Sequence, residues 1–289
     1  MQIVKSVKRL RSILSEVRSK GRKIGFVPTM GYFHEGHLSL MRVAQKECDF
    51  CVVSIYVNPK QFGPKEDLNR YPRDIKRDAT MIQKENVDIL FIPSDNDIYP
   101  NCYLTYIDVE RISNTLCGKY RPGHFRGVAT VVAKFLNIVQ PDLMYLGQKD
   151  AQQVVVLSQM VADLNFSTRI RVVPTAREKD GLAKSSRNIH LSAQERAQAP
   201  VLYRSLTDAA HCIQAGEHSA LKIIGQIQRT ITQQSIGRIQ YVACVDAQTL
   251  EPLRIIKGKV LIALAVYFGK TRLIDNVIIP FKKSSKVQG

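Results

Sequence analysis

The sequence predicts an α/β protein with a Rossmann-like N-terminal domain, a parallel sheet covered by helices on both faces, and a smaller α+β C-terminal domain. Two observations predict this fold class. Up to about residue 176, short apolar runs alternate with amphipathic helical patterns. After that point, long helical patterns come first and three apolar or alternating runs follow them.

The apolar runs of the first part have the length and composition of buried strands. Helical patterns lie between several of them, and apolar residues from Ile3 to Val17 also fall at helical spacing. Strands that alternate with helices favour a parallel sheet, which binds ligands at the carboxyl ends of its strands. The expected strands are 23–29, 51–57, 87–93, 141–147 and 169–175, and the helices between them are 37–48, 73–86, 124–139 and 149–164.

The pattern after residue 176 predicts helices packed on a small antiparallel sheet. Helical patterns cover 192–215 and 219–234, and strands are expected at 239–247, 259–269 and 271–277. We therefore expect a catalytic domain over 1–176 and a smaller domain over 177–289, with the boundary between 175 and 185.

Composition excludes several classes of protein. The chain of 289 residues is 45% hydrophobic and 23% charged, as folded proteins are. No apolar run reaches the ~20 residues of a membrane span. The basic N-terminus lacks a secretory apolar core, and Glu16 interrupts the alternative reading as a transit peptide. Six cysteines without an export signal indicate reduced thiols and a cytoplasmic protein, and the single CxxC at Cys48 and Cys51 favours burial over zinc.

The net charge of +17 is compatible with a nucleic-acid partner, a merely basic surface or a pocket for anionic small molecules. Composition does not choose among the three. The basic residues are spread along the chain, apart from the tail at 282–289, and do not interleave with aromatic residues. We therefore expect no nucleic acid as a partner.

The stretch PTMGYFHEGHLSL places His34 and His37 between a predicted strand and a predicted helix. Gly36 permits close approach of the backbone, and a helix start offers N–H groups to an anion. Imidazoles at this place can donate hydrogen bonds to phosphate oxygens and stabilise charge in a transition state. Core histidines and a metal site are the alternatives, and a zinc site would need further ligands such as His124 or His190.

Two further stretches carry groups suited to phosphate. GQKD, from Gly147 to Asp150, follows an apolar run and opens a helix; Lys149 suits a phosphate, and Asp150 suits a helix cap or ribose hydroxyls. KSSRN, from Lys184 to Asn188, sets two cations around two hydroxyls. A capped helix and a solvated loop are the plain structural readings of these two stretches.

Side-chain amides and aromatic residues gather in NPKQF, from Asn58 to Phe62, and in the RYPRD that follows. Amides select hydroxyl and carboxylate groups, although Asn-Pro is also a common turn opener. RPGHFRGV brings Arg121, His124 and Arg126 to a predicted helix start, where they either bind an anion or cap the helix.

Taken together, these stretches resemble the pantothenate synthetase (pantoate–β-alanine ligase) family. The resemblance runs in order through PTMGYFHEGHLSL, SIYVNPKQFGPKEDLNRYPRD, RPGHFRGVATVVAKFLNIVQPD, GQKDAQQ, REKDGLAKSSRNIHLS and GKTRLIDN, nearly the whole chain. HEGH and KSSRN look like the two ATP-binding signatures of the wider nucleotidyltransferase superfamily. The resemblance implies an ATP- and Mg²⁺-dependent ligase that joins pantoate to β-alanine through pantoyl adenylate, releases AMP and diphosphate, and works as a cytoplasmic homodimer in pantothenate and coenzyme A synthesis.

The resemblance also implies the roles of individual residues. It makes His37 the proton donor, and it assigns His34, Lys149, Ser185, Ser186 and Arg187 to stabilising the phosphates. It makes Gln61 and Gln153 the pantoate-binding glutamines, with Asn58, Tyr71 and Arg121 in the substrate pocket. The remaining implied ATP contacts are Pro28, Thr29, Met30, Gly31, Gly36, Gly147, Gln148, Asp150, Ala176 and Lys184. No protein ligand for the metal is implied.

The chain departs from the family pattern at four positions. Lys184 stands where many relatives have Met, Ala151 where many have Tyr, Ala176 where a larger aliphatic residue is usual, and Tyr32 at a variable position that is commonly small. None of these changes removes a charged or hydrogen-bonding group that the implied mechanism needs.

Overall fold

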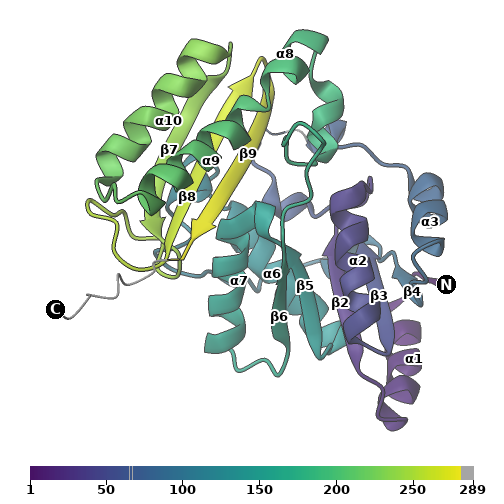
Figure 1. Cartoon of the computed structure of the whole chain (residues 1–289). Helices are drawn as coiled ribbons and strands as arrows, with labels where there is room; N and C mark the ends of the chain where they lie inside the picture. Colours follow the sequence, from purple (N-terminus) through teal and green to yellow (C-terminus); the bar gives the residue numbers. More distant parts are fainter. Residues whose placement is uncertain (65, 67, 281–289) are drawn as a thin grey trace. The chain divides into compact units, whose positions relative to one another are not determined.

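The computed structural model describes residues 1–64, 66 and 68–280, so the basic tail at 282–289 lies outside the described residues. The chain divides into two compact units (Figure 1). One contains Met1–Ala176 and Lys184–Ser186, and the other contains Arg177–Ala183 and Arg187–Gly289. The stretch KSSRN, residues 184–188, falls within the range 177–289 that we predicted as the smaller domain, and it is divided between the two units.

A six-stranded parallel sheet forms the centre of the N-terminal unit, in the order β1-β4-β3-β2-β5-β6. This confirms the predicted fold class. Strand order reverses at β2, whose neighbours are β3 and β5, and ligands bind at such a switch point in open α/β sheets. The strands are β1 (Gln2–Val4), β2 (Ile24–Thr29), β3 (Phe50–Ile55), β4 (Ile89–Phe91), β5 (Leu143–Gly147) and β6 (Arg169–Val173).

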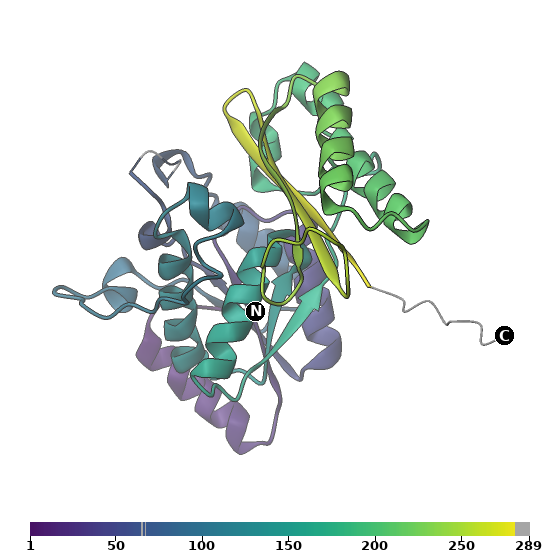
Figure 2. The ribbon, with the colours of Figure 1, turned by 90° about the vertical axis from the view of Figure 1, so that its left-hand side faces the viewer.

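Helices cover both faces of this sheet (Figures 1 and 2). Successive side chains of a strand point to opposite faces of the sheet. Val27 packs with Met41 and Ile82 on one face. On the other face, the ring centroids of Phe26 and Phe135 lie 5.7 Å apart. The long helices are α1 (Val7–Ser19), α2 (Glu35–Glu47), α3 (Ile75–Gln83), α6 (His124–Val139) and α7 (Ala151–Asp163), and the short ones are α4 (Asp95–Ile98), α5 (Leu116–Tyr120), η1 (Pro59–Gln61), η2 (Leu68–Arg70) and η3 (Gln148–Asp150).

The N-terminus departs from our prediction. Ile3 and Val4 lie in β1, not in a helix, and pair with Leu90 and Phe91 of β4. The helix begins only at Val7 because the Ser6 hydroxyl caps it by accepting from the Arg9 backbone N–H. The amphipathic pattern therefore ran across an element boundary.

The C-terminal unit has a three-stranded antiparallel sheet, β7-β8-β9, formed by β7 (Arg238–Asp246), β8 (Val260–Phe268) and β9 (Thr271–Ile279). Helices α9 (Val201–Gln214) and α10 (Ala220–Gln234) lie side by side on it (Figure 1). The predicted helix 192–215 is broken into α8 (Ala193–Gln198) and α9, because Pro200 lacks the N–H that a continuous helix needs. A further short helix, η4 (Ser186–His190), precedes α8.

Candidate active site

The turn between β2 and α2 sets the two histidines of HEGH. His34 is the N-cap of α2, and its Nδ1 accepts from the Gly36 backbone N–H at 3.1 Å. The Nδ1 of His37 accepts in turn from the His34 backbone N–H at 3.3 Å. A ring nitrogen that accepts from a backbone N–H carries no proton, so each neutral ring has its proton on Nε2. Both rings are therefore hydrogen-bond donors through Nε2.

Gly36 is required by this arrangement. A Cβ at position 36 would lie 2.8 Å from His34 Cε1 and 2.9 Å from its Nδ1, closer than real contacts allow. The same Cβ would lie 3.9 Å from the Cβ of Ala176, which places Ala176 beside the turn. The backbone N–H of Lys184 donates to the Ala176 carbonyl at 2.9 Å. Ala176 and Lys184, both assigned to ATP from the sequence, are thus paired with each other near HEGH.

His37 is held neutral. Burial lowers its pKa well below the usual range, and its closeness to His34 and to the Lys149 ammonium lowers it further. The two rings lie 4.1 Å apart, centroid to centroid. Lys149 follows β5, the strand next to β2, so the switch point brings HEGH and GQKD together as the sequence suggested. Gly147 comes two residues before Lys149, and a Cβ there would meet no described atom within 4 Å, which leaves room for a close ligand.

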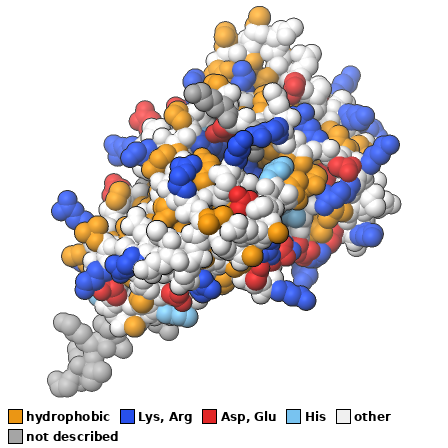
Figure 3. Space-filling view, turned by 90° about the horizontal axis from the view of Figure 1, so that it is seen from above, with side chains coloured by type: hydrophobic (Ala, Val, Ile, Leu, Met, Phe, Trp, Pro, Cys, Tyr) orange, Lys and Arg blue, Asp and Glu red, His pale blue; other side chains and the backbone are white. Residues whose placement is uncertain are grey.

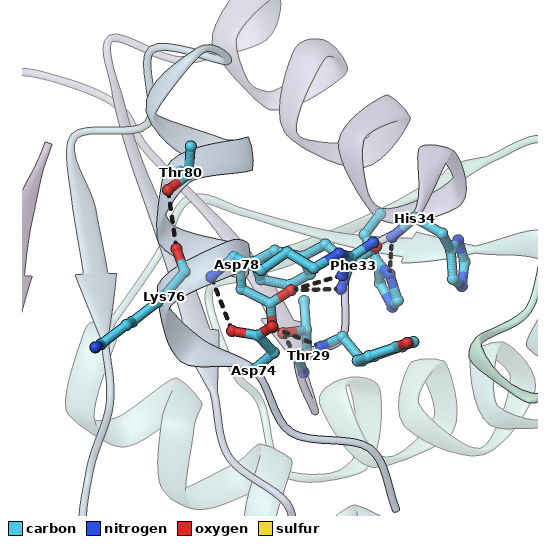
Figure 4. A network of polar contacts seen from close by, with 11 residues as sticks. Thr29, Phe33, His34, Asp74, Lys76, Asp78 and Thr80 are labelled. Atoms are coloured by element: carbon cyan, nitrogen blue, oxygen red, sulfur yellow. Dashed lines mark hydrogen bonds and ion pairs between the residues drawn. The ribbon is translucent and has the colours of Figure 1, made fainter.

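Asp78 is a residue that sequence reasoning missed. Its carboxylate, on α3, accepts from the backbone N–H groups of Tyr32 at 2.6 Å and Phe33 at 2.8 Å (Figure 4). Burial raises its pKa, while these bonds and Arg77 oppose the rise. The signal in the sequence was an acid one helical turn before Ile82, on the apolar face of a predicted helix.

The NPKQF turn holds the amide of Gln61 in one orientation. Asn58 is only 1% exposed; its Oδ1 accepts from the Lys60 backbone N–H at 3.2 Å, and its Nδ2 donates to the Gly127 carbonyl at 3.0 Å. These backbone partners identify which Asn58 atom is nitrogen. Because Nδ2 also donates to Gln61 Oε1 at 3.1 Å, the Gln61 NH₂ points the other way, to the Met30 sulfur at 3.1 Å.

His124 and Arg121 support the same turn. His124 Nδ1 donates to the Gln61 carbonyl at 2.7 Å, and its Nε2 accepts from Arg121 at 3.0 Å. Burial and the Arg121 charge lower the His124 pKa to about 4, so the ring is neutral. Arg121 also forms an ion pair with Glu66 at 2.6 Å. Burial raises the pKa of Glu66, but Arg121, together with the Gly63 backbone N–H and His124, lowers it overall.

The other residues implied by the resemblance lie on elements of either unit. Tyr71 is 7% exposed, and its ring centroid lies 6.0 Å from that of Phe62. Gln153 is half-buried on α7. Its neighbour Gln152 is occupied by the backbone at Ile112, Thr115 and Cys117. Ser185 and Ser186 belong to the N-terminal unit with Lys184, whereas Arg187 belongs to the C-terminal unit.

The described residues contain neither a metal-binding cluster nor a membrane-spanning helix. They contain no cluster of three or more His, Cys, Asp or Glu side chains placed to hold a metal ion. None of their helices combines the length and apolar character needed to cross a bilayer. Lys and Arg side chains are spread over the face in Figure 3, with Asp and Glu among them.

The switch point of this parallel sheet carries two imidazole donors, a lysine and a glycine with free space around it. These features are typical of a nucleotide-dependent α/β enzyme. The sequence profile of the pantoate–β-alanine ligase family matches residues 2–278. The chain belongs to this family.

Named relatives are similar over nearly their full length. The pantothenate synthetase of Thermosipho melanesiensis is 53% identical over 279 residues, which cover 96% of this chain and 99% of the relative. A crystal structure of pantothenate synthetase from Thermus thermophilus has a TM-score of 0.91 and 43% identity, covering 96% of this chain and 99% of that one. The pantoate–β-alanine ligase of Francisella tularensis, complexed with β-γ ATP and β-alanine, has a TM-score of 0.78 and 38% identity, covering 96% and 97%.

Proposed function

We propose that this chain condenses pantoate with β-alanine, using ATP, to give pantothenate, AMP and diphosphate. The observation that carries the proposal is the fixed amide of Gln61. The Gln61 NH₂ group is a hydrogen-bond donor, and its contact with the Met30 sulfur places it beside the HEGH turn. A donor without fixed charge suits the carboxylate and hydroxyl oxygens of pantoate, next to groups suited to phosphate.

In the first step, a pantoate carboxylate oxygen attacks the α-phosphorus of ATP. The bond from that phosphorus to the bridging oxygen breaks, and diphosphate leaves. Negative charge grows on the phosphate oxygens, where hydrogen-bond donors are most effective if they are already in place. We assign His34 and His37, through their Nε2 protons, and Lys149 to this role. Ser185 and Ser186 of the same unit are proposed to complete the phosphate site, and Arg187 stays a predicted ATP contact.

In the second step, the neutral amine of β-alanine attacks the acyl carbon of pantoyl adenylate. The bond between that carbon and the AMP oxygen breaks, and the nitrogen loses a proton. AMP is already a good leaving group, so the protein contributes mainly by holding the amine close to the acyl carbon. Gln61 and Gln153 are proposed to hold pantoate, with Tyr71 lining the pocket.

The structure suggests a different role for two residues in this pocket. Asn58 has both side-chain atoms occupied by protein partners, and Arg121 is paired with Glu66 and His124. We therefore assign Asn58 to positioning Gln61 and Arg121 to supporting the Gln61 turn. The N-terminal unit is proposed to bind ATP and pantoate, and Lys184, Ser185 and Ser186 belong to that unit.

Mg²⁺ is proposed to enter with ATP, because it is usually held by substrate phosphates and water together with few protein ligands. We further propose a homodimer. In its support, Leu104 is 86% exposed within a stretch, Tyr103–Val109, that has neither helix nor strand. All six cysteines are free thiols, which favours a reducing compartment such as the cytoplasm.

The test is isotope exchange between diphosphate and ATP, with Mg²⁺ and pantoate present and β-alanine absent. Pantoate-dependent exchange is expected, because adenylate formation is reversible. If exchange is absent, AMP release after addition of β-alanine decides whether diphosphate was merely trapped. Absence of both, from folded protein that binds ATP, would overturn the proposal.

A further inference from the structure

Asp78 lies outside every group assigned to the reaction, yet it is buried against the turn that carries the histidines. It is 1% exposed and comes from α3, more than forty residues after HEGH. A buried carboxylate is costly unless its oxygens are paired. Here Oδ2 accepts from the Tyr32 N–H and Oδ1 from the Phe33 N–H, as Figure 4 shows for this cluster.

The turn that Asp78 holds has an unfavourable backbone. Gly31 has φ of 81° and Tyr32 has φ of 53°, both in the left-handed region. For a residue with a side chain, such as Tyr32, this conformation is strained and persists only when the surroundings enforce it. A Cβ on Gly31 would lie 3.0 Å from Asp78 Oδ2, so turn and acid fit closely.

Arg77 holds the same turn from the same helix. Its guanidinium donates to the Phe33 carbonyl at 2.9 Å and to Asp78 Oδ1 at 3.3 Å, and it lies 4.8 Å from the centre of the Tyr32 ring. Both polar groups of the Phe33 backbone are therefore fixed by α3.

The next residue after this turn is His34. Its backbone N–H donates to His37 Nδ1, and that bond determines which nitrogen of His37 carries the proton. A shift of the Phe33 backbone would move the His34 N–H and release both rings. Asp78 itself has both oxygens occupied by the turn, so it acts through other residues.

We propose that Asp78 is a positioning residue for His34 and His37, holding the HEGH turn so that both rings present Nε2–H donors. The inference rests on the proposed function, in which these donors stabilise charge on the phosphates. Asp78 contributes no atom to the reaction; it fixes the backbone from which the reacting side chains extend.

The first test replaces Asp78 by Asn, which keeps the shape but turns an NH₂ toward a backbone N–H. We expect kcat for adenylate formation to fall roughly 10- to 100-fold, because misplacement of about 1 Å has that effect. The pantoate KM should stay within about two-fold, because the Asp78 carboxylate bonds to Tyr32, Phe33 and Arg77 and the bonds that orient the Gln61 amide come from Asn58 and Met30. The matched control is Asp74→Asn, the same change at the N-cap of the same helix, where Asn caps as well as Asp.

A double variant separates positioning from general loss of structure. If Asp78 acts through the histidines, Asp78→Asn should slow the His37→Ala enzyme by clearly less than it slows the wild type, because only His34 is then left to be misplaced. An effect as large as in the wild-type background would overturn the proposal, as would a single Asp78→Asn variant as fast as Asp74→Asn.

A measurement without turnover keeps this test independent of the proposed function. The ¹⁵N signals of the imidazoles report which ring nitrogen is protonated. We expect Asp78→Asn to change the His34 and His37 signals while Asp74→Asn leaves them as in the wild type. Unchanged signals in Asp78→Asn would overturn the positioning role, whereas a wild-type protein without exchange activity would count only against the proposed function.

If Asp78→Asn does not fold, Arg77→Met serves instead. It removes the donor to the Phe33 carbonyl from a half-exposed position and leaves Asp78 in place. We expect a smaller fall in kcat, with the same changes in the imidazole signals. Normal kcat and signals in folded Arg77→Met would contradict the proposal.

Discussion

Gly127 of α6 lies directly against the Gln61 turn, and adding one methyl group there tests the pocket. A Cβ at position 127 would lie 2.3 Å from the Lys60 carbonyl oxygen and 2.6 Å from the Gln61 nitrogen. Ordinary contact begins near 3.4 Å, so the turn must retreat by about 1 Å in Gly127→Ala. The Gly127 carbonyl also accepts from Asn58, whose other bond orients the Gln61 amide.

The magnitude follows from these distances. Overpacking of this kind costs about 1–3 kcal/mol of folding stability. Loss of one well-oriented hydrogen bond costs about 0.5–1.5 kcal/mol, so the pantoate KM should rise by up to about ten-fold. The ATP KM should change by less than about two-fold, since the atoms nearest the new Cβ belong to Lys60 and Gln61 and not to the HEGH turn.

The assay is pantoate-dependent release of AMP, with each substrate varied in turn and with thermal unfolding measured in parallel. The control is Gly225→Ala, within α10, where the nearest atom to the new Cβ is Arg229 Nη1 at 3.8 Å. That change should stabilise the protein by about 0.5–1 kcal/mol, as alanine does in helices, and leave both KM values alone. A Gly127→Ala enzyme with normal pantoate KM would refute the reasoning from Asn58 to Gln61.

Three further predictions concern single side chains. His37→Ala should lower kcat roughly 10²-fold or more with little change in melting temperature, and an unchanged rate would remove His37 from the chemistry. Gln61→Ala should weaken pantoate far more than ATP in titrations of each ligand; equal weakening would contradict the pocket assignment. The His124 pKa of about 4 lies below its ordinary value of 6.5, so the unfolded chain binds more protons between these pH values. The free energy of unfolding should therefore fall as the pH drops from 6.5 toward 4, by up to about 1.4 kcal/mol per pH unit. Urea unfolding of the His124→Gln variant should lack this pH-dependent contribution.

The strands and the places of the polar motifs were predictable because buried parallel strands are continuous apolar runs. Each motif follows such a run, and β2 and β5 then bring HEGH and GQKD to one edge of the sheet. The strand β1 was not predictable in the same way, because its three residues continue the apolar spacing of α1. Its partner, β4, lies far along the chain.

The supporting residues were hidden for a different reason. Asp78 and Asn58 act through bonds to backbone groups of distant residues, Phe33 and Gly127, and no local pattern encodes such a bond. The sequence predicted that Asn58 either opens a turn or binds substrate through its amide. Both predictions used only the neighbouring residues in the chain. The site histidines, by contrast, stood out because their turn and their helix start are contiguous in the sequence.

The bonds from Asp78 to the Tyr32–Phe33 turn also bear on the order in which the molecule assembles. The turn is local, but the acid that holds it is 45 residues away, so α3 must dock before the left-handed backbone is secured. Growing chains emerge from the ribosome N-terminus first, so the histidines are exposed before their support exists. A chain cut short before α3 would hold every residue of HEGH and still lack the arrangement of its imidazoles.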